Sequence, residues 1–533
     1  MAYLVGGGGQ PIMVLKEGTD RKTKKDAFSN NVAAALAISE AVKSTLGPKG
    51  LDKLLVDGMG DITITNDGAT ILKDIGVDHP TAKIMVEVAK TQDDEIGDGT
   101  TTSVIIAGSI LSNLSDLIQG GVHPTIVAKG ISKAKEKALE ILDEIAYKLS
   151  DSDKELMKKV IATSMNSKVI SLGKNFLAGL VLEAILGLKN AGVKNLNKNV
   201  SKIKIVKKEG GTIDDTKLVK GIVLDKEIVH SQMPTLVKDP KIALLGFALE
   251  VKKGEWDGKI SIKNPDQIQS FLDEEERMIE TKVQQLVDMG VTSILSHKSM
   301  DDKAIHFLKK AGILAVKGIS ESDLKLVAEA VGGKILNSLE EMMENDLGTC
   351  GKIEARKVGN SKFLFIEECE NPQAMTILIR GEGAKLLEEV DRGLHDALCV
   401  AATLVQEMAI VGCGGAAEIE LTKRLKAYAK TFSGREQLVV DFFAESLQII
   451  PITLVENAGL DAMDVIGDLN AAHKTDADVF KGYNLFTNKI EDMKDAGIME
   501  PVGLVKTAIK TAAEAAMMIV RIDDIIRAGN LSG

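Results

Sequence analysis

The stretch Gly97-Asp98-Gly99-Thr100-Thr101-Thr102 constrains the fold most, because it leads directly into an apolar segment with helical spacing, residues 103–117. Glycines let backbone N–H groups approach a ligand, and threonine hydroxyls can cap a helix. A helix N-terminus with free N–H groups is a natural phosphate site. Asp98 would repel a phosphate unless a hard cation such as Mg²⁺ lay between them. The stretch predicts a metal-nucleotide site, although an ordinary turn and N-cap would explain the same residues.

The composition is that of a globular protein. The 533 residues, 44% of them hydrophobic and 27% charged, leave room for three or four domains of about 150 residues each. A net charge of −11 argues against a nucleic-acid binder. The four cysteines form no CxxC pair, which fits a reducing compartment. With no leader-like N-terminus and no run of about 20 apolar residues, we expect a cytoplasmic protein that contacts no membrane.

The order of patterns along the chain predicts an inserted domain. Helical spacing begins at Asn31 and stops at Gly47-Pro48, and strand-like alternation in 54–64 ends at the turn Asn66-Asp67-Gly68. Short strands are expected at 202–206, 242–249, 293–295, 313–316 and 363–366, alternating with helices at 267–289 and 323–331. Further helices are expected at 125–149, 385–408 and 505–527. This order favours an α/β domain inserted into a helical domain built from both chain ends.

Four other segments each have two interpretations. The run Leu46-Gly47-Pro48-Lys49-Gly50 is either a helix C-cap with a turn or a second backbone cradle for phosphates. Asp67 is explained by a turn, or it orients or deprotonates a water attacking a phosphate. Asp396 forms a surface ion pair with Arg392 four residues earlier, or its carboxylate takes part in chemistry. Gly412-Cys413-Gly414-Gly415 is a flexible turn or a close backbone approach to a ligand.

Five motifs in order resemble the signatures of group II chaperonins, and within that family they look most like the archaeal thermosomes. They are Thr45-Leu46-Gly47-Pro48-Lys49-Gly50, Thr65-Asn66-Asp67-Gly68, Gly97-Asp98-Gly99-Thr100-Thr101-Thr102, Asn457-Ala458-Gly459-Leu460-Asp461 and Arg521-Ile522-Asp523-Asp524. The resemblance extends from about Gly8 to the C-terminus.

The resemblance implies a multidomain α and α/β fold. A mostly helical equatorial ATPase domain would take residues 1–150 and 408–533, and a small α+β intermediate domain would take 151–219 and 372–407. An inserted α/β apical domain at 220–371 would bind substrate and carry a helical lid protrusion at about 250–276. The implied partners are non-native polypeptides and identical or related subunits in a stacked double ring, without nucleic acid or membrane.

The implied cofactors are ATP and Mg²⁺. Carried over by motif, Asp98 would bind Mg²⁺, and Asp67 and Asp396 would flank the attacking water, with Asp396 on a mobile middle domain that couples hydrolysis to closure. Lys168 resembles a lysine that senses the γ-phosphate, and Glu500 would hold the ribose. The nucleotide contacts would be Thr45, Leu46, Gly47, Pro48, Gly99, Thr100, Thr101, Thr102, Lys168, Gly414, Gly415 and Glu500.

The chain departs from the family pattern in places, and two other functions stay open. Cys413 interrupts a run that is often all glycine, Val169 replaces a glycine, and the Gly/Met-rich tail of many archaeal members is missing. A metabolic ATP-dependent enzyme would need a second polar pocket in the α/β domain, for which 267–272 is too apolar. A non-catalytic ring scaffold would bind nucleotide without turnover, which the three acids Asp67, Asp98 and Asp396 disfavour.

Overall fold

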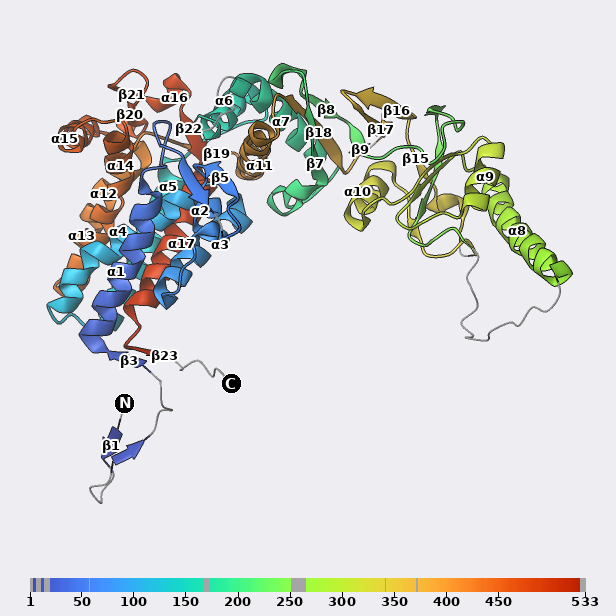
Figure 1. Ribbon diagram of the computed structural model, residues 1–533. Helices are drawn as coiled ribbons and strands as arrows, with labels where there is room; N and C mark the ends of the chain where they lie inside the picture. The colour runs from blue at the N-terminus through green and yellow to red at the C-terminus, as the bar shows by residue number, and fades with distance from the viewer. Residues whose placement is uncertain are drawn as a thin grey trace. The chain divides into compact units, whose positions relative to one another are not determined.

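The chain divides into two compact units. The computed structural model describes residues 3–5, 11–13, 20–56, 58–166, 173–250, 265–340, 342–370 and 372–527 (Figure 1). One unit combines Met1–Leu182 with Arg392–Gly533, and the other is Glu183–Asp391. Both chain ends therefore contribute to the first unit. A finer division into three domains remains a prediction.

The first unit is built around helix α4, Thr100–Gln119, which contacts α1, Lys24–Lys43, α3, Pro80–Ile96, and α17, Val502–Val520. Blue and red ribbons from opposite chain ends lie side by side in this bundle (Figure 1). Helix α4 has no charged residue before Asp116, so it can be buried over most of its circumference. The bundle is completed by α5, Pro124–Ile145, α12, Ala416–Ala429, α13, Arg435–Ser446, and α14, Ile449–Asn457.

Smaller elements surround the bundle. A sheet of order β22-β19-β6 joins Met499–Pro501, Ala409–Gly412 and Tyr147–Lys148, and a hairpin pairs β20, Lys481–Asn484, with β21, Lys489–Asp492. Helix α6, Lys154–Ser164, follows β6, helix α15, Ala462–Ala472, precedes β20, and helix α16, Met493–Ala496, joins β21 to β22. Helices α7, Lys174–Asn190, and α11, Ala384–Glu407, each continue across the division between the units.

Three expectations for the first unit were wrong. The last helix ends at Val520, and β23, Asp524–Arg527, pairs antiparallel with β3, Asp20–Thr23. Asp523 and Asp524 are unfavourable near the negative end of a helix dipole, which explains this early end. The run Asn66-Asp67-Gly68 does not close the hairpin: β4, Lys53–Val56, and β5, Ile62–Thr65, pair directly, and α2, Gly68–Asp74, begins after them. The first helix also begins earlier than expected, at Lys24.

The second unit has the expected α/β character. Strands β11, Lys241–Leu245, β12, Ser293–Ser296, and β13, Leu314–Val316, pair in parallel, as strands do when helices connect them. The connecting helices are α8, Pro265–Asp288, and α9, Asp302–Lys310, and α10, Glu321–Val331, follows β13. Strands β14, Ile335–Leu336, and β15, Gly348–Thr349, complete this sheet on β11. Of the expected lid at about 250–276, residues 251–264 lie outside the described chain.

Two further sheets belong to this unit. One has the order β10-β16-β17-β9, with strands Leu236–Lys238, Lys352–Val358, Ser361–Glu367 and Gly221–Leu224. The other has the order β7-β18-β8, with strands Ile203–Glu209, Met375–Gly381 and Lys217–Val219. The second sheet joins residues from before and after the α/β sheet, because β7 and β18 pair in parallel over seven positions.

Two helical stretches of the described chain, Thr100–Gln119 and Arg435–Asn457, are long and apolar enough to cross a membrane by length and composition alone. In each stretch, 56% of the most apolar 18-residue window is buried inside the protein. Core helices of globular proteins pass the same test, so burial accounts for their composition.

Helices α5 and α13 pack closely at Gly130, and adding one methyl group at this glycine tests the contact. A Cβ atom on Gly130 would lie 2.5 Å from Val439 Cγ1, whereas one on Gly179 of α7 would meet no atom within 4 Å. Alanine improves helix propensity at both sites by about 1 kcal/mol. We expect Gly179→Ala to raise the thermal unfolding midpoint. Gly130→Ala should lower it, because overpacking costs about 1–3 kcal/mol. A midpoint raised by Gly130→Ala would contradict this packing.

Candidate functional site

Helix α4 begins with an uncapped N-terminus. Gly97 and Gly99 both have left-handed backbones, with φ of 76° and 77°, and no side chain caps the helix at Gly99. The first N–H groups of a helix have no partner within it, so those that follow Gly99 can bind an anion. The Asp98 carboxylate stays beside them because its Oδ1 accepts from Gly99 N at 2.7 Å.

The loop after α1 is held in place by Asn457, a residue whose role could not be predicted from the sequence. Its Nδ2 donates to the carbonyls of Lys43 at 3.0 Å and Leu46 at 2.9 Å. Gly47 has φ of 82°, and a Cβ atom there would lie 2.2 Å from Leu454 Cδ2. The loop therefore packs closely on α14, which carries both Leu454 and Asn457.

The smaller of two neighbouring cavities, about 90 Å³, is lined by residues from four segments that are far apart in the sequence. The segments are the loop after α1, the start of α2, the start of α4 and one turn of α11. Its lining is Thr45, Leu46, Gly47, Asn66, Asp67, Gly68, Asp98, Gly99, Thr100, Thr101, Thr102 and Asp396. Asp67, Asp98 and Asp396 thus border one hollow within the first unit.

Asp67 has a structural role at this cavity. It is the N-cap of α2, and its carboxylate accepts from Ala69 N at 3.3 Å, Thr70 N at 2.8 Å and Thr70 Oγ1 at 2.6 Å. Gly68 brings α2 against α4, because a Cβ atom there would lie 2.4 Å from Thr101 Oγ1. The capping bonds fix the carboxylate, which has about four lone-pair sites and can still accept from a further donor.

Several acidic side chains lie close together around the smaller cavity. Burial, followed by the charge of Asp67, raises the pKa of Asp93, and Asp94 and Asp98 add to the effect while His395 opposes it. Among the described residues, no group of three His, Cys, Asp or Glu side chains could hold a metal ion by itself. A cation here would need oxygens from a bound molecule beside the protein's carboxylates. This donor set suits Mg²⁺ carried by a phosphate ligand, because Mg²⁺ prefers oxygen ligands and keeps few protein ones.

A larger cavity of about 210 Å³ shares Leu46, Gly47, Asp98 and Thr102 with the smaller one. Helix α12 begins beside it with Gly415 as an N-cap in the left-handed region and without a side-chain cap, as α4 does at Gly99. Its lining also includes Pro48, Asn166, Cys413, Gly414, Gly415, Glu418, Tyr483, Asn484, Leu485, Phe486 and Glu500. Two uncapped helix starts therefore border one continuous site.

Two carboxyl groups in the larger cavity favour protonation. Burial raises the pKa of Glu418 to about 7. Burial, followed by the charges of Glu418 and Asp98, raises the pKa of Glu500 well above its usual range. The pKa of the Cys413 thiol is raised by burial and then by the charges of Glu500 and Glu418. A protonated carboxyl can donate a hydrogen bond, which suits a ligand with hydroxyl groups.

Every nucleotide-site residue named from the sequence lies at these two cavities except Lys168, which falls outside the described residues. The sequence did not indicate roles for Asn457, for Glu418 or for Tyr483 to Phe486, which lie on β20 and the turn after it. Asn457 is the first residue of the motif Asn457-Ala458-Gly459-Leu460-Asp461, but the spacing of this motif does not indicate which carbonyls the side chain reaches. Glu418 could have been noticed as an acid in the first turn of the helix that follows Gly415.

Comparison with known proteins gives one consistent result. The sequence profile described as the TCP-1/cpn60 chaperonin family matches residues 38–530. The chain is 47% identical to thermosome subunit beta of Methanothermobacter thermautotrophicus, covering 98% of this chain and 96% of that protein. It is 45% identical to thermosome subunit alpha of Archaeoglobus fulgidus, covering 98% and 96%. It is 44% identical to a thermosome subunit of Methanopyrus kandleri, covering 100% and 97%.

The raised pKa of Glu418 predicts a pH-dependent stability. The unfolded chain loses the Glu418 proton above the ordinary pKa of a glutamate, whereas the folded protein keeps it up to about pH 7. The free energy of unfolding therefore falls as pH rises toward about 7. The loss amounts to about 3 kcal/mol at most. We expect Glu418→Gln to flatten this fall and to unfold at a higher temperature than wild type at pH 8.

The control is Glu140→Gln, which removes an exposed carboxylate on α5. This change should leave the pH dependence of the unfolding temperature as in wild type. If Glu418→Gln kept the wild-type slope between pH 5 and 7, Glu418 would be ionised throughout.

Proposed function

The chain belongs to the TCP-1/cpn60 chaperonin family, and from this premise we propose that it is a ring-forming group II chaperonin subunit. In this proposal it binds and hydrolyses Mg-ATP, closes a built-in lid and promotes folding of non-native polypeptides in the cytoplasm. The single observation that supports the ATPase most is that two uncapped helix starts and three acidic residues border one site within one unit. Such a site can accept a phosphate chain together with its cation.

In this proposal different residues bind the phosphates, the cation and the ribose of Mg-ATP. The amides of Thr100, Thr101 and Thr102 bind phosphate oxygens, and Asp98 holds Mg²⁺ against them. When bound, Mg²⁺ neutralises phosphate charge during phosphoryl transfer. Thr45, Leu46, Gly47 and Pro48 form the second backbone cradle, and Lys168 senses the terminal phosphate. Gly414 and Gly415 approach the nucleotide closely, while Glu500 holds the ribose.

Asp67 and Asp396 carry the hydrolytic step in this proposal. Both border the smaller cavity with Asp98, so a water held there can be oriented and deprotonated by a carboxylate. Asp67 is fixed by the backbone amides that it caps. Asp396 lies on α11, which begins at Ala384 in the second unit and ends at Glu407 in the first. Its placement on a helix that both units share would couple hydrolysis to their movement.

Substitution of two acids should separate hydrolysis from binding. We expect Asp396→Ala to lower ATP turnover by about a hundredfold or more while Mg-ATP still binds, because general base catalysis is lost. Asp98→Ala should instead weaken Mg-ATP binding by about tenfold or more, because the cation loses its protein ligand. Phosphate release and nucleotide titration measure the two effects.

The matched control is Asp94→Ala, which removes an exposed acid from the same acidic region without changing either cavity lining. It should leave turnover and affinity near wild type. Wild-type turnover in Asp396→Ala would remove that residue from catalysis. Activity that required a small-molecule acceptor would favour the metabolic enzyme, and binding without turnover would favour the scaffold.

An apolar hairpin supports assembly with identical or related subunits. Leu54 faces Ile64 across β4 and β5, and Val56 faces Ile62. These four side chains are exposed by 61%, 49%, 62% and 49%. Exposed apolar side chains gathered on one element are typical of a subunit interface. In the proposal a neighbouring subunit of the ring covers this hairpin, in keeping with relatives named as alpha and beta subunits.

Charging one cross-strand pair tests this interface. The double variant Leu54→Lys with Ile64→Glu preserves the hairpin through an opposite-charge pair but removes its apolar face. We expect it to dissociate the assembly, which native mass spectrometry and light scattering would measure as a lower mass than wild type. The control Met278→Lys charges an exposed apolar residue of α8 and should not change the mass. A double variant with wild-type mass would exclude the hairpin as the interface.

A further inference from the structure

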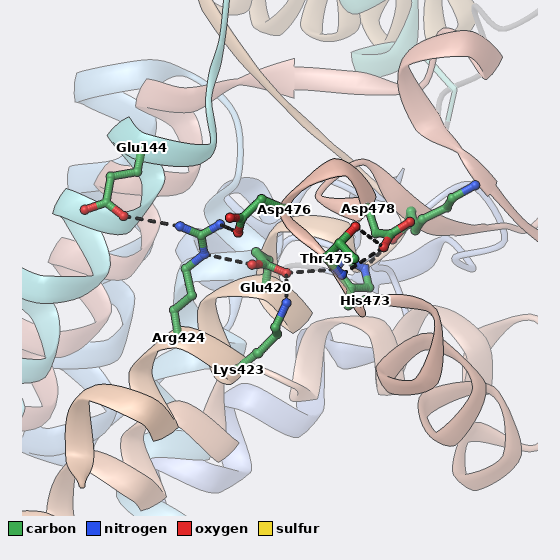
Figure 2. Close-up of polar contacts among 9 residues, drawn as sticks. Glu144, Glu420, Lys423, Arg424, His473, Thr475, Asp476 and Asp478 are labelled. Atoms are coloured by element: carbon green, nitrogen blue, oxygen red, sulfur yellow. Dashed lines mark hydrogen bonds and ion pairs between the residues drawn. The ribbon is translucent and has the colours of Figure 1, made fainter.

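A buried charged cluster is centred on α12 (Figure 2). Its central residues, Glu420 and His473, line neither cavity. At its centre is Glu420, whose side chain is 0% exposed. One carboxylate oxygen accepts from Arg424 Nε at 2.7 Å, and the other is contacted by His473 Nδ1 at 3.1 Å and Lys423 Nζ at 3.4 Å. A fully buried carboxylate is costly unless it is paired in this way, so the cluster requires an explanation.

Both ring nitrogens of His473 face oxygen atoms. Its side chain is 1% exposed, and Nε2 lies 2.7 Å from the carbonyl oxygen of Lys481, which can only accept a hydrogen bond. On the other side, Nδ1 faces Glu420. Burial opposes ionisation of Glu420, but hydrogen bonds from His473 and Arg424 outweigh it and lower its pKa to about 2. An ionised carboxylate also only accepts, so hydrogen bonds to both neighbours need both ring nitrogens to donate, as those of an imidazolium do.

The His473 ring connects two walls of the larger cavity. Glu420 lies on α12, whose first turn begins at Gly415 beside that cavity. Lys481 is the first residue of β20, and two residues later Tyr483 N donates to Gly414 O at 2.9 Å. A Cβ atom on Gly414 would lie 2.6 Å from Tyr483 O, so the strand and the glycine loop are in close contact.

We propose that Glu420 and His473 are a positioning pair for the nucleotide cavity, in which the imidazolium ties β20 to α12 and keeps the wall from Tyr483 to Phe486 against Gly414 and Gly415. The inference rests on the proposed function only in taking the ligand of that cavity to be a nucleotide. Neither residue contacts the ligand. Both act through the wall that they hold, as outer residues orient the groups that bind a metal or substrate.

The remaining charges of the cluster face outward. Arg424 also donates to Glu144 at 3.3 Å and to Asp476 at 2.8 Å, and these two carboxylates are 53% and 91% exposed. Asp478 caps the backbone of Thr475 nearby (Figure 2). Exposed pairs contribute little, so the outer carboxylates provide controls that keep the buried pair intact.

Two substitutions separate the ends of the tie. In the assembled full-length protein, His473→Asn can still donate to Glu420 but not reach the Lys481 carbonyl, and His473→Gln can donate to that carbonyl but not to Glu420. We expect both to weaken binding of a non-hydrolysable Mg-ATP analogue by about tenfold, with turnover at saturating ATP close to wild type. The control Asp476→Asn should change affinity by less than about twofold.

Magic-angle-spinning NMR of sedimented protein labelled with ¹⁵N-histidine reads the ring directly. Among seven histidines, the signal lost in His473→Gln identifies His473, and it should show two protonated nitrogens at neutral pH. A neutral ring, or wild-type affinity in both folded variants, would overturn the positioning pair. Wild-type protein that neither bound nor hydrolysed ATP would instead overturn the proposed function, whatever the state of His473.

Discussion

Burial of α4 in the first unit is the constraint on which the site depends. The helix carries no charge over its first four turns and contacts α1, α3 and α17, which come from both chain ends. Because these helices pack around it, α4 cannot shift without opening the core. Its uncapped N-terminus at Gly99 is therefore a fixed point, and the other loops of the site are placed relative to it.

Close backbone contacts bring those loops together. Gly68 lets α2 meet the start of α4, and Gly47 lets the loop after α1 pack on α14. Gly414 lets the loop before α12 meet Tyr483. At each of these positions a Cβ atom would come within 2.6 Å of a neighbouring atom. Asn457 and the Glu420–His473 pair then hold the loop after α1 and the strand β20 by hydrogen bonds. The loops of the site are thus held in place by close backbone packing and by hydrogen bonds to neighbouring residues.

The electrostatics differ between the two cavities. The smaller one is bordered by Asp67, Asp98 and Asp396, and the pKa of nearby Asp93 is raised by burial and by Asp67. This arrangement gains stability from a cation. At the larger cavity, burial raises the pKa of Glu418 and of Glu500, so carboxyl groups there can remain protonated and donate. One continuous site therefore offers acceptors for a cation at one end and donors at the other.

Sequence by itself determined the periodic helices, the α/β character of the middle of the chain and the family. It also located the glycine-rich loops, because glycine and threonine before an apolar run have a local physical meaning. The ends of elements were predicted less accurately: the last helix was expected to reach Arg527 but ends at Val520, and Asp67 caps a helix where a turn was expected. The family resemblance implied that Asp67, Asp98 and Asp396 act at one site, but only the tertiary structure decided that they border one cavity and that Glu420 is paired with His473. The reason is physical: both arrangements depend on packing between segments far apart in the chain, which local propensity and spacing do not encode.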